Sequence, residues 1–293
     1  MVGNPNSGKS SLFNVLTGLN QKVGNFPGVT VEKKTGKCKL DASTMVDMVD
    51  LPGSYSLYPR RMDEWVAYQV LLQQDKEVKP DLVLVVADAC NLKRNLLFVS
   101  QLIDLKIPAV LALTMLDVAA KKQIKVHSLE LQRALGIPVV EVNPRKQTGI
   151  ATLKKTLLSV YQGMYKPPAF DFIPNRSLAP DAIQAARELF PGMSDYALVH
   201  QLIHYKSFHL SEEKAQRTEV IVQQYAFNAT RVQADEIIQR YKRIQTIMQQ
   251  SVTQTAIIPK ELLSEKIDKI LLHKVWGYVI LLSVLFFLFQ SVF

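Results

Sequence analysis

The feature that most restricts the fold is a complete phosphate-binding loop near the first residue, Gly3-Asn4-Pro5-Asn6-Ser7-Gly8-Lys9-Ser10, which fits the pattern GxxxxGK[ST]. In such loops backbone N–H groups surround the α- and β-phosphates, the lysine reaches the β- and γ-phosphate oxygens, and the serine hydroxyl binds Mg²⁺. Residues 11–18 follow with amphipathic helical spacing and stop at a glycine. A helix N-terminus would then face the phosphates, so we predict a nucleotide site rather than a glycine turn that fits by chance.

The strand that should lead into this loop is unusually short. Only Met1 and Val2 precede Gly3, whereas a phosphate-binding loop normally follows a buried central strand. We therefore expect that the first residues of this strand are missing from the sequence.

Composition narrows the class of protein. The 293 residues leave room for two domains, and 48% of them are hydrophobic, which is enough for a real core. The net charge of +9 suits an anionic partner, either nucleic acid or the cytoplasmic leaflet of a membrane. Two cysteines, Cys38 and Cys90, indicate neither a disulfide framework nor a zinc site, so we expect buried thiols in a reducing cytosol.

A second candidate element is the loop of residues 24–31, which is punctuated by Gly and Pro. In hydrolases that sense the γ-phosphate, a loop threonine gives its hydroxyl to Mg²⁺ and its N–H to the phosphate. We predict this role for Thr30. Its neighbours are expected beside the nucleotide: Gly28, Val29, Val31 and Glu32.

A third element, Asp50-Leu51-Pro52-Gly53, follows two strand-like runs at residues 35–40 and 45–49. Asp50 can hold Mg²⁺ through a water while the Gly53 N–H reaches the γ-phosphate. Ser54 follows at the position where many switch GTPases carry the glutamine that orients the attacking water. Hydrolysis by that route is therefore excluded, and either turnover is slow or another group or ion supplies the missing stabilisation.

Two later segments would contact the base. Buried strands are predicted over residues 81–87 and 109–115, and the second ends in Thr114-Met115-Leu116-Asp117. Asp117 can accept two hydrogen bonds from guanine, whereas the N1 acceptor of adenine would be repelled, so we predict GTP rather than ATP. A helix-capping Asp117 is the alternative. A strand over residues 138–142 then leads into a polar loop expected beside the base and ribose: Asn143, Pro144 and Arg145.

These elements predict a doubly wound, mostly parallel α/β fold with a truncated first strand, a P-loop GTPase domain over residues 1–165. Lys166-Pro167-Pro168 marks a boundary, and a helical domain of four or five helices is expected over residues 166–262. His200 and His204 in it have the spacing of a metal pair, with His209 nearby. No third ligand is evident, so roles in the core and on the surface are favoured.

The C-terminal segment is apolar. Residues 275–293 carry no charge, and Lys266, Lys269 and Lys274 precede them, with Trp276 and Tyr278 at interface depth. We predict a membrane lead-in and first transmembrane helix over residues 263–293, with residues 1–270 on the cytoplasmic side and more chain to follow.

Taken together, several strings resemble one family, the bacterial ferrous iron transport protein B family (FeoB). They are GNPNSGKSSLFN, VGNFPGVTVE, DLPGSYSL, ADACNLKRNL, VVEVNPRK and KIDKILLHKVWG, and they cover nearly the whole chain. The resemblance implies a G domain, a helical domain that restrains GDP release, and the start of a larger Fe²⁺ permease in the inner membrane. It also implies a homo-oligomer, small accessory Feo proteins as partners, and catalytic roles for Asn4, Lys9, Thr30 and Gly53.

Two further expectations rest on the resemblance. Asn4 would ligate K⁺ as in potassium-stimulated members, with carbonyls near Gly24 and Phe26. In the absence of the glutamine, this fixed cation could stabilise the charge that develops between the β- and γ-phosphates. Thr114 departs from the family, which usually has Asn there. The Asn contacts to guanine N7 and to the phosphate loop would be lost or shortened, so we predict weaker nucleotide binding.

Two other functions compete with a GTPase that gates iron uptake. A regulatory module in which GTP occupancy matters more than turnover is favoured by the missing glutamine. A soluble RNA-associated GTPase would suit the basic charge, but it predicts an RNA-binding module and no apolar tail, and the sequence has neither a GXXG loop nor a polar end. We therefore expect no nucleic-acid partner.

Overall fold

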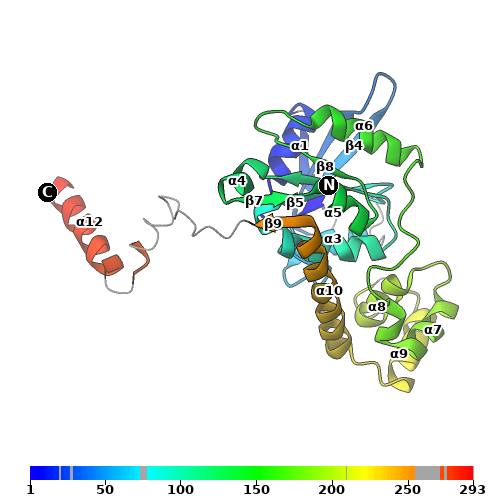
Figure 1. Cartoon of the computed structure of the whole chain (residues 1–293). Helices are drawn as coiled ribbons and strands as arrows, with labels where there is room; N and C mark the ends of the chain where they lie inside the picture. The colour runs from blue at the N-terminus through cyan, green and yellow to red at the C-terminus, as the bar shows by residue number, and fades with distance from the viewer. Residues whose placement is uncertain are drawn as a thin grey trace. The chain divides into compact units, whose positions relative to one another are not determined.

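The structure is a computed structural model that describes residues 1–19, 21–26, 29–72, 78–208, 210–254, 271–273 and 276–292. It divides into two compact units, Met1–Gln254 and Thr255–Phe293 (Figure 1).

A parallel four-stranded sheet forms the centre of the first unit. Its strands lie in the order β1 (Val2–Gly3), β5 (Val83–Asp88), β6 (Ala109–Thr114) and β8 (Val139–Glu141). Strands β5 and β6 are apolar almost throughout because helices cover both faces, as the continuous apolar runs predicted. The predicted doubly wound fold is confirmed.

Alternate residues of the central strands enter two separate cores. Leu84 and Val110 pack on one face with α1 (Lys9–Thr17) and α6 (Ile150–Tyr161). Val85 and Leu111 pack on the other face with the core residues of three helices: α2 (Met62–Leu71), α3 (Leu92–Asp104) and α5 (Ser128–Leu135). The sheet therefore holds the ends of its strands, where the candidate loops begin, in fixed positions. Short η1 (Ala89–Asn91) and α4 (Leu116–Lys121) follow β5 and β6 at those ends.

A second, antiparallel sheet consists of β2 (Gln21–Asn25), β3 (Glu32–Lys39) and β4 (Met45–Asp50). Its first hairpin takes in the first two residues of the predicted loop over residues 24–31, because Gly24 pairs with Lys33 and Asn25 pairs with Glu32. The start of this pairing was missed because the exposed, lysine-rich β3 has no apolar alternation to mark it.

Backbone hydrogen bonds join this second sheet to β1. The Met1 amino group donates to Val49 O at 2.6 Å, and Leu51 N donates to Met1 O at 3.0 Å. Strand β1 has two residues, in agreement with the short first strand seen in the sequence.

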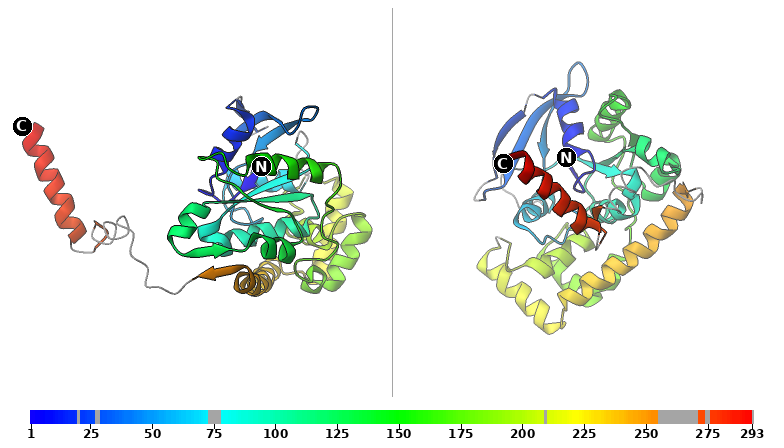
Figure 2. Two further views of the ribbon diagram at one scale, coloured as in Figure 1. Left: turned by 45° about the horizontal axis from the view of Figure 1, so that its top comes forward. Right: turned by 90° about the vertical axis from the view of Figure 1, so that its left-hand side faces the viewer.

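The helical segment contains η2 (Asn175–Leu178), α7 (Pro180–Leu189), α8 (Asp195–His204), α9 (Glu212–Gln224) and α10 (Ala229–Ser251). Helices α7, α8 and α9 gather at the beginning of the long α10 around a separate apolar cluster (Figures 1 and 2). The far end of α10 instead packs into the main core through Ile244 and Ile247. The described residues between 166 and 254 thus contain four α-helices, and a separate helical domain over residues 166–262 stays a prediction.

One small sheet escaped prediction. Strands β7 (Ile124–Val126) and β9 (Val252–Gln254) pair antiparallel, and each is only three residues long. Runs this short show no readable periodicity. Through them the last described residues of the helical segment return to the α/β part, and residues 1–254 form one unit. The proposed domain border at residue 165 stays a prediction.

The second unit contains α12 (Trp276–Val292), a helix of 17 residues. Among the described residues no helix is long and apolar enough to cross a membrane. The spanning helix over residues 263–293 stays a prediction. Residues 255–270, 274, 275 and 293, with the three predicted flanking lysines, lie outside the described residues.

Candidate functional site

The phosphate-binding loop connects the end of β1 to the start of α1. A Cβ atom placed on Gly3 would lie 2.4 Å from Val86 O, so only glycine lets β1 approach β5 this closely. Asn6 and Gly8 both have positive φ, 63° and 82°, which turns the loop before the helix begins at Lys9. The predicted strand, loop and helix are therefore present, with the first N–H groups of α1 at the loop.

The segment 50–53 lies directly against this loop. Asp50 ends β4, is buried, and forms a close ion pair with the ammonium group of Lys9. A Cβ on Gly53 would stand 3.1 Å from Pro5 N, and Ser54 N donates to Gly3 O at 3.2 Å. The structure thus brings together the two elements that were predicted to hold the phosphates and Mg²⁺. Leu51 is buried beneath them, and Pro52 is half-buried.

The loop also contains polar atoms without partners. Asn4 and Ser7 are 3% and 1% exposed, and within the described part of the chain neither the Asn4 amide nitrogen Nδ2 nor the Ser7 hydroxyl has a hydrogen-bond partner. Buried polar groups are nearly always hydrogen-bonded, so such orphans suggest a ligand. Together with the Lys9 ammonium and the exposed Ser10 hydroxyl, this set of donors and oxygens fits a phosphate chain with its Mg²⁺ ion.

Thr114 ties a third element to the loop. Its buried hydroxyl lies 2.7 Å from Ser7 O and 3.0 Å from Ala87 O, so it can donate to either carbonyl. The sequence left open whether the contact with the phosphate loop is lost or shortened, and the shorter side chain still reaches Ser7. The next residue, Met115, has φ 59°, and Asp117 is exposed in the first turn of α4. Its carboxylate is therefore available to a base.

The loop after β8 is held in shape by hydrogen bonds of Asn143. Asn143 pairs with Thr148 through both backbone groups, and its Oδ1 accepts from Lys146 N at 3.1 Å. A Cβ on Gly149 would lie 2.0 Å from Glu141 O, so glycine is required where the loop enters α6. Pro144 is half-buried and Arg145 is exposed. The loop is thus rigid at its base, in the strand-end position where a nucleotide base was expected.

The segment 24–32 is less clearly part of the site. Phe26 is buried in the main core and its N–H donates to Val31 O at 2.9 Å, and Val29 and Val31 pack against the same core. Thr30 is exposed, and among the described residues no hydrogen bond joins it to Ser10 or Asp50. Glu32 is paired with Lys34 at 3.7 Å. Gly24 lies in β2, and Gly28 lies outside the described residues.

Ser54 occupies the position of the missing glutamine, but its hydroxyl is not available to orient an attacking water. It is 3% exposed, and its hydroxyl donates to Ser56 O at 2.6 Å. A buried hydroxyl that is already committed to a local carbonyl cannot orient a water, which agrees with the inference from sequence.

A buried polar network beyond residue 54 was not predicted. Leu57 N donates to Gln101 Oε1 at 2.8 Å, and Gln101 Nε2 lies 3.2 Å from Glu236 Oε1 on α10. Glu236 in turn forms a close ion pair with Arg240. The loop after Gly53 is therefore connected through α3 to the helical segment. The only signal in the sequence was the i,i+4 spacing of Glu236 and Arg240, which also fits a surface pair.

Arg240 is fully buried at the centre of this network. Its Nη2 lies 2.8 Å from Asp104 Oδ2, its Nη1 donates to Ser100 O at 2.8 Å, and its guanidinium stands 4.5 Å from the ring centroid of Tyr196. Burial alone would lower the pKa of Arg240, but Tyr196 and the two carboxylates raise it above its ordinary value. Burial raises the pKa of Asp104, although Arg240 opposes this.

An aromatic cluster with two histidines lies beside the network. His200 is fully buried, stacks on Tyr58 at 5.2 Å, and its Nδ1 is 3.1 Å from the Tyr68 hydroxyl. Burial lowers the pKa of His200 well below its ordinary value and lowers that of the half-buried His204. No group of three or more His, Cys, Asp or Glu side chains among the described residues could hold a metal ion. His209 lies outside them.

Comparison with known proteins decides the family. The model of the family described as ferrous iron transport protein B matches residues 1–157. The chain belongs to the ferrous iron transport protein B family. A curated FeoB relative, the Fe(2+) transporter of Leptospira biflexa, is 34% identical over 100% of this chain and 43% of its own length. A Porphyromonas gingivalis relative, named as a fusion of Fe(2+) transport protein A with the FeoB transporter, is 32% identical over 100% of this chain.

Solved FeoB structures share the fold. A GDP-bound point mutant of the S. thermophilus FeoB G-domain is 33% identical, with a TM-score of 0.71, and the match covers 86% of this chain and 98% of that one. The cytosolic domain of L. pneumophila FeoB is 31% identical with the same TM-score of 0.71, again over 86% and 98%. The chain therefore matches these G-domain and cytosolic-domain structures over nearly their whole length, whereas it spans only 43% of the Leptospira transporter.

Proposed function

We propose that residues 1–254 bind and hydrolyse GTP and form the cytosolic, nucleotide-dependent part of a membrane Fe²⁺ transporter. The observation that carries the proposal is the meeting of three predicted elements, through the Lys9–Asp50 ion pair and the contact of Thr114 with Ser7. The likeness to a GDP-bound FeoB G-domain supports the same assignment.

The phosphates would lie against residues 3–10, where the loop N–H groups and the orphaned Asn4 and Ser7 side chains supply donors. Lys9 would leave Asp50 for the β- and γ-phosphate oxygens, and Asp50 would then face Mg²⁺ through a water. Ser10 and Thr30 are the other two proposed Mg²⁺ ligands. The ion neutralises charge on the phosphates when bound.

Recognition of the base is assigned to Asp117, with Asn143, Pro144 and Arg145 beside the base and ribose. The exposed Asp117 carboxylate can accept from guanine N1–H and N2–H₂. The segments Gly28–Glu32 and Asp50–Gly53 are proposed to contact the γ-phosphate. Thr30 has to approach the phosphates for this, because it is exposed and makes no hydrogen bond to Ser10 or Asp50 among the described residues.

Turnover is proposed to be slow, because Ser54 is buried and donates to Ser56 O. A K⁺ ion held by Asn4 with carbonyls near Gly24 and Phe26 would supply part of the missing stabilisation. Asn4 suits this role because it is buried at the phosphate loop, and its side-chain oxygen Oδ1 would be the ligand.

The committed Ser54 hydroxyl also favours a second function, a nucleotide-sensing module with negligible turnover. In that case the buried network from Leu57 to Arg240 would report whether the site is occupied, and hydrolysis would be incidental. The two functions differ in one measurable quantity, the rate of phosphate release.

The larger assembly is proposed from the relatives. As part of a transporter, residues 1–254 would stand on the cytoplasmic side of a bacterial inner membrane. The P. gingivalis fusion favours a small accessory Feo protein as a partner, and a homo-oligomer is proposed as well. Iron itself would be handled by parts of such a transporter that this chain does not contain.

Calorimetric titration with Mg-GTP tests the core of the proposal. We expect saturable binding that Lys9→Ala weakens at least tenfold, because the phosphates lose their point charge. Lys125→Ala is the matched control, since Lys125 is exposed on β7 and should leave binding unchanged. No binding heat with either GTP or GDP would refute a nucleotide site.

Phosphate release in KCl and in NaCl then separates the two functions. Faster release in KCl that Asn4→Ala abolishes would support K⁺-stimulated hydrolysis. Binding without release in either salt would favour the nucleotide-sensing module.

A further inference from the structure

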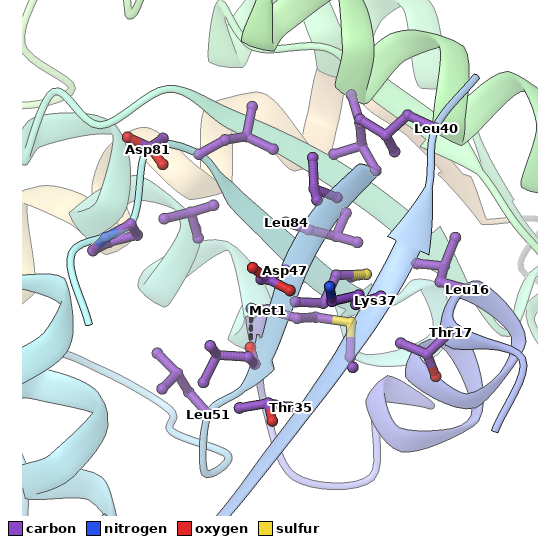
Figure 3. A pocket seen from close by; sticks show the side chains of 18 of the residues that line it. Met1, Leu16, Thr17, Thr35, Lys37, Leu40, Asp47, Leu51, Asp81 and Leu84 are labelled. Atoms are coloured by element: carbon purple, nitrogen blue, oxygen red, sulfur yellow. Dashed lines mark hydrogen bonds between the residues drawn. The ribbon is translucent and has the colours of Figure 1, made fainter. Parts of the chain in front are cut away.

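The loop after β4 is fixed on both sides of Gly53. Before it, Leu51 N donates to Met1 O at 3.0 Å, and Figure 3 shows Leu51 close to Met1, among the residues that line a groove beside β4. After it, Ser54 N donates to Gly3 O at 3.2 Å. The Gly53 N–H, which is proposed to reach the γ-phosphate, therefore belongs to a segment whose conformation is set by its neighbours.

Tyr55 is the next residue, and it lacks such a partner. Within the part of the chain that the structure describes, neither its backbone nor its ring hydroxyl forms a hydrogen bond. Hydrogen bonding to the rest of the protein resumes at Leu57, whose N–H donates to Gln101 Oε1 at 2.8 Å. The side chain of Tyr55 is half-buried, so the position of this residue depends on what its ring contacts.

Arg94 of α3 covers this ring. Its guanidinium carbon lies 3.7 Å from the ring centroid of Tyr55, which is the shortest cation–π distance among the described residues. At this distance the planar guanidinium lies directly on the face of the ring. Arg94 forms no hydrogen bond or ion pair with another described residue. The ring contact is therefore the polar interaction that this side chain makes.

The place of Arg94 in α3 does not favour the helix itself. Lys93 and Arg94 both lie in the first turn of α3, and this turn contains no acidic residue. Positive charges at a helix N-terminus oppose the helix dipole and are unfavourable there. The side chain of Arg94 is also exposed, so burial does not force it onto the ring. Its contribution is therefore to the loop that carries Tyr55 and not to the stability of α3.

We infer that Arg94 is a positioning residue for the γ-phosphate. By holding the ring of Tyr55, it keeps Gly53 and Ser54 in the conformation that directs the Gly53 N–H to this phosphate. Gly53 has no side chain to restrict its own rotation, so its peptide depends on restraint from the residues around it. The inference rests on the proposed nucleotide function. It adds a residue that favours GTP over GDP, because only GTP carries the phosphate that Gly53 would contact.

Titration with a non-hydrolysable GTP analogue and with GDP separates this role from a purely structural one. Arg94→Ala should weaken binding of the analogue by about two- to fivefold, as expected for loss of a cation–π contact at an exposed site, and leave GDP binding unchanged. Arg94→Lys keeps a cation over the ring and should fall between Arg94→Ala and the parent. Lys93→Ala removes the neighbouring exposed charge and is the matched control, which should bind both nucleotides as the parent does.

Variants of Tyr55 show whether Arg94 acts through the ring. Tyr55→Phe keeps the aromatic face and should behave as the parent, whereas Tyr55→Leu should weaken binding of the analogue as Arg94→Ala does. The double variant of Arg94→Ala with Tyr55→Leu should bind no more weakly than either single variant, because both changes remove the same contact. Additive losses in the double variant would overturn the inference. Equal weakening of GDP and of the analogue by Arg94→Ala would overturn it as well.

Hydrogen exchange follows the loop in the absence of nucleotide. The Ser54 amide, which donates to Gly3 O, should exchange about two- to fivefold faster in Arg94→Ala, while the Ala112 amide in β6 stays unchanged as an internal reference. Unchanged exchange at Ser54 would refute the hold of Arg94 on the loop. If the parent bound neither nucleotide, the proposed nucleotide function would be wrong, and the exchange at Ser54 would still decide whether Arg94 holds the loop.

Discussion

Removal of one hydroxyl should loosen the phosphate-binding loop. Thr114 is 1% exposed, and its Oγ1 is 2.7 Å from Ser7 O and 3.0 Å from Ala87 O. Thr114→Val keeps the shape of the side chain but removes the one hydroxyl hydrogen that either of these two carbonyl oxygens can accept. One of them belongs to the loop that is proposed to hold the phosphates.

The expected size follows from these contacts. Loss of a buried hydrogen bond with an acceptor left unsatisfied costs about 1–3 kcal/mol. At roughly 2–4 °C per kcal/mol, the melting temperature should fall by roughly 2–12 °C. In the variant, GDP binding also has to order the loop around the Ser7 carbonyl. If about 1.4 kcal/mol of binding free energy is spent on this, GDP binds about tenfold more weakly.

Fluorescence titration with labelled GDP measures this effect. Thr114→Ser is the control, because it keeps the hydroxyl and should bind GDP as the parent does. Thr114→Asn adds an amide that can reach guanine N7, so it should bind more tightly than the parent. Equal affinities for the Val variant and the parent would refute the role given to the hydroxyl, and equal affinities for the Asn variant would refute the predicted weakness of Thr114.

Three further predictions concern the network, the buried histidine and the base. Arg240→Met should lower the free energy of unfolding by about 3–5 kcal/mol, because it leaves Asp104 and Glu236 buried without their cation. Urea denaturation measures this loss, and Arg217→Met, which changes an exposed arginine, is the control. His200 remains neutral in the folded state, so the stability it contributes is complete above its ordinary pKa of 6.5 and falls by about 1.4 kcal/mol per pH unit below it. His200→Phe should reduce that slope in denaturation at pH 7 and pH 5, and an unchanged slope would contradict the assignment. Asp117→Asn should weaken GTP binding and favour xanthosine triphosphate, whose C2 oxygen accepts a hydrogen bond from the new amide. If the variant still binds GTP more tightly in a competition titration, the role assigned to Asp117 is wrong.

A second variant at Arg240 separates the charge of the side chain from its hydrogen bonds. Arg240→Lys keeps the charge but loses the fork of donors, so it should fall between the parent and Arg240→Met. A loss below about 1 kcal/mol for Arg240→Met would mean that the carboxylates find other partners.

Elements marked by strong local chemistry could be predicted from the sequence. The loop at residues 3–10, the strand that ends at Asp50 and the strand that ends at Thr114 were identified because glycines, buried apolar runs and a following acid coincide there. The structure places these three together, as the parallel sheet required. The reach of the Thr114 hydroxyl to Ser7 was missed, because sequence does not give the distance between two strand ends.

Long-range pairing explains most of the other differences. The partners β7 and β9 are far apart in the chain, and β2 is a short polar run, so neither case leaves a readable periodic signal. The burial of Arg240 was equally hidden, since its charge suggests a surface residue until α3 and Tyr196 are seen to enclose it. The apolar tail was read correctly as a helix over its described residues.

Helix α10 has a consequence for how the protein melts. Val232 near its start belongs to the core of α7–α9, whereas Ile244 and Ile247 near its end belong to the core beneath the parallel sheet. One continuous helix thus contributes side chains to two hydrophobic cores, and the loss of either core would disrupt the packing of the other. Heat should therefore unfold residues 1–254 in a single cooperative transition, with calorimetric and van't Hoff enthalpies that agree, even though the composition of the chain changes near residue 165.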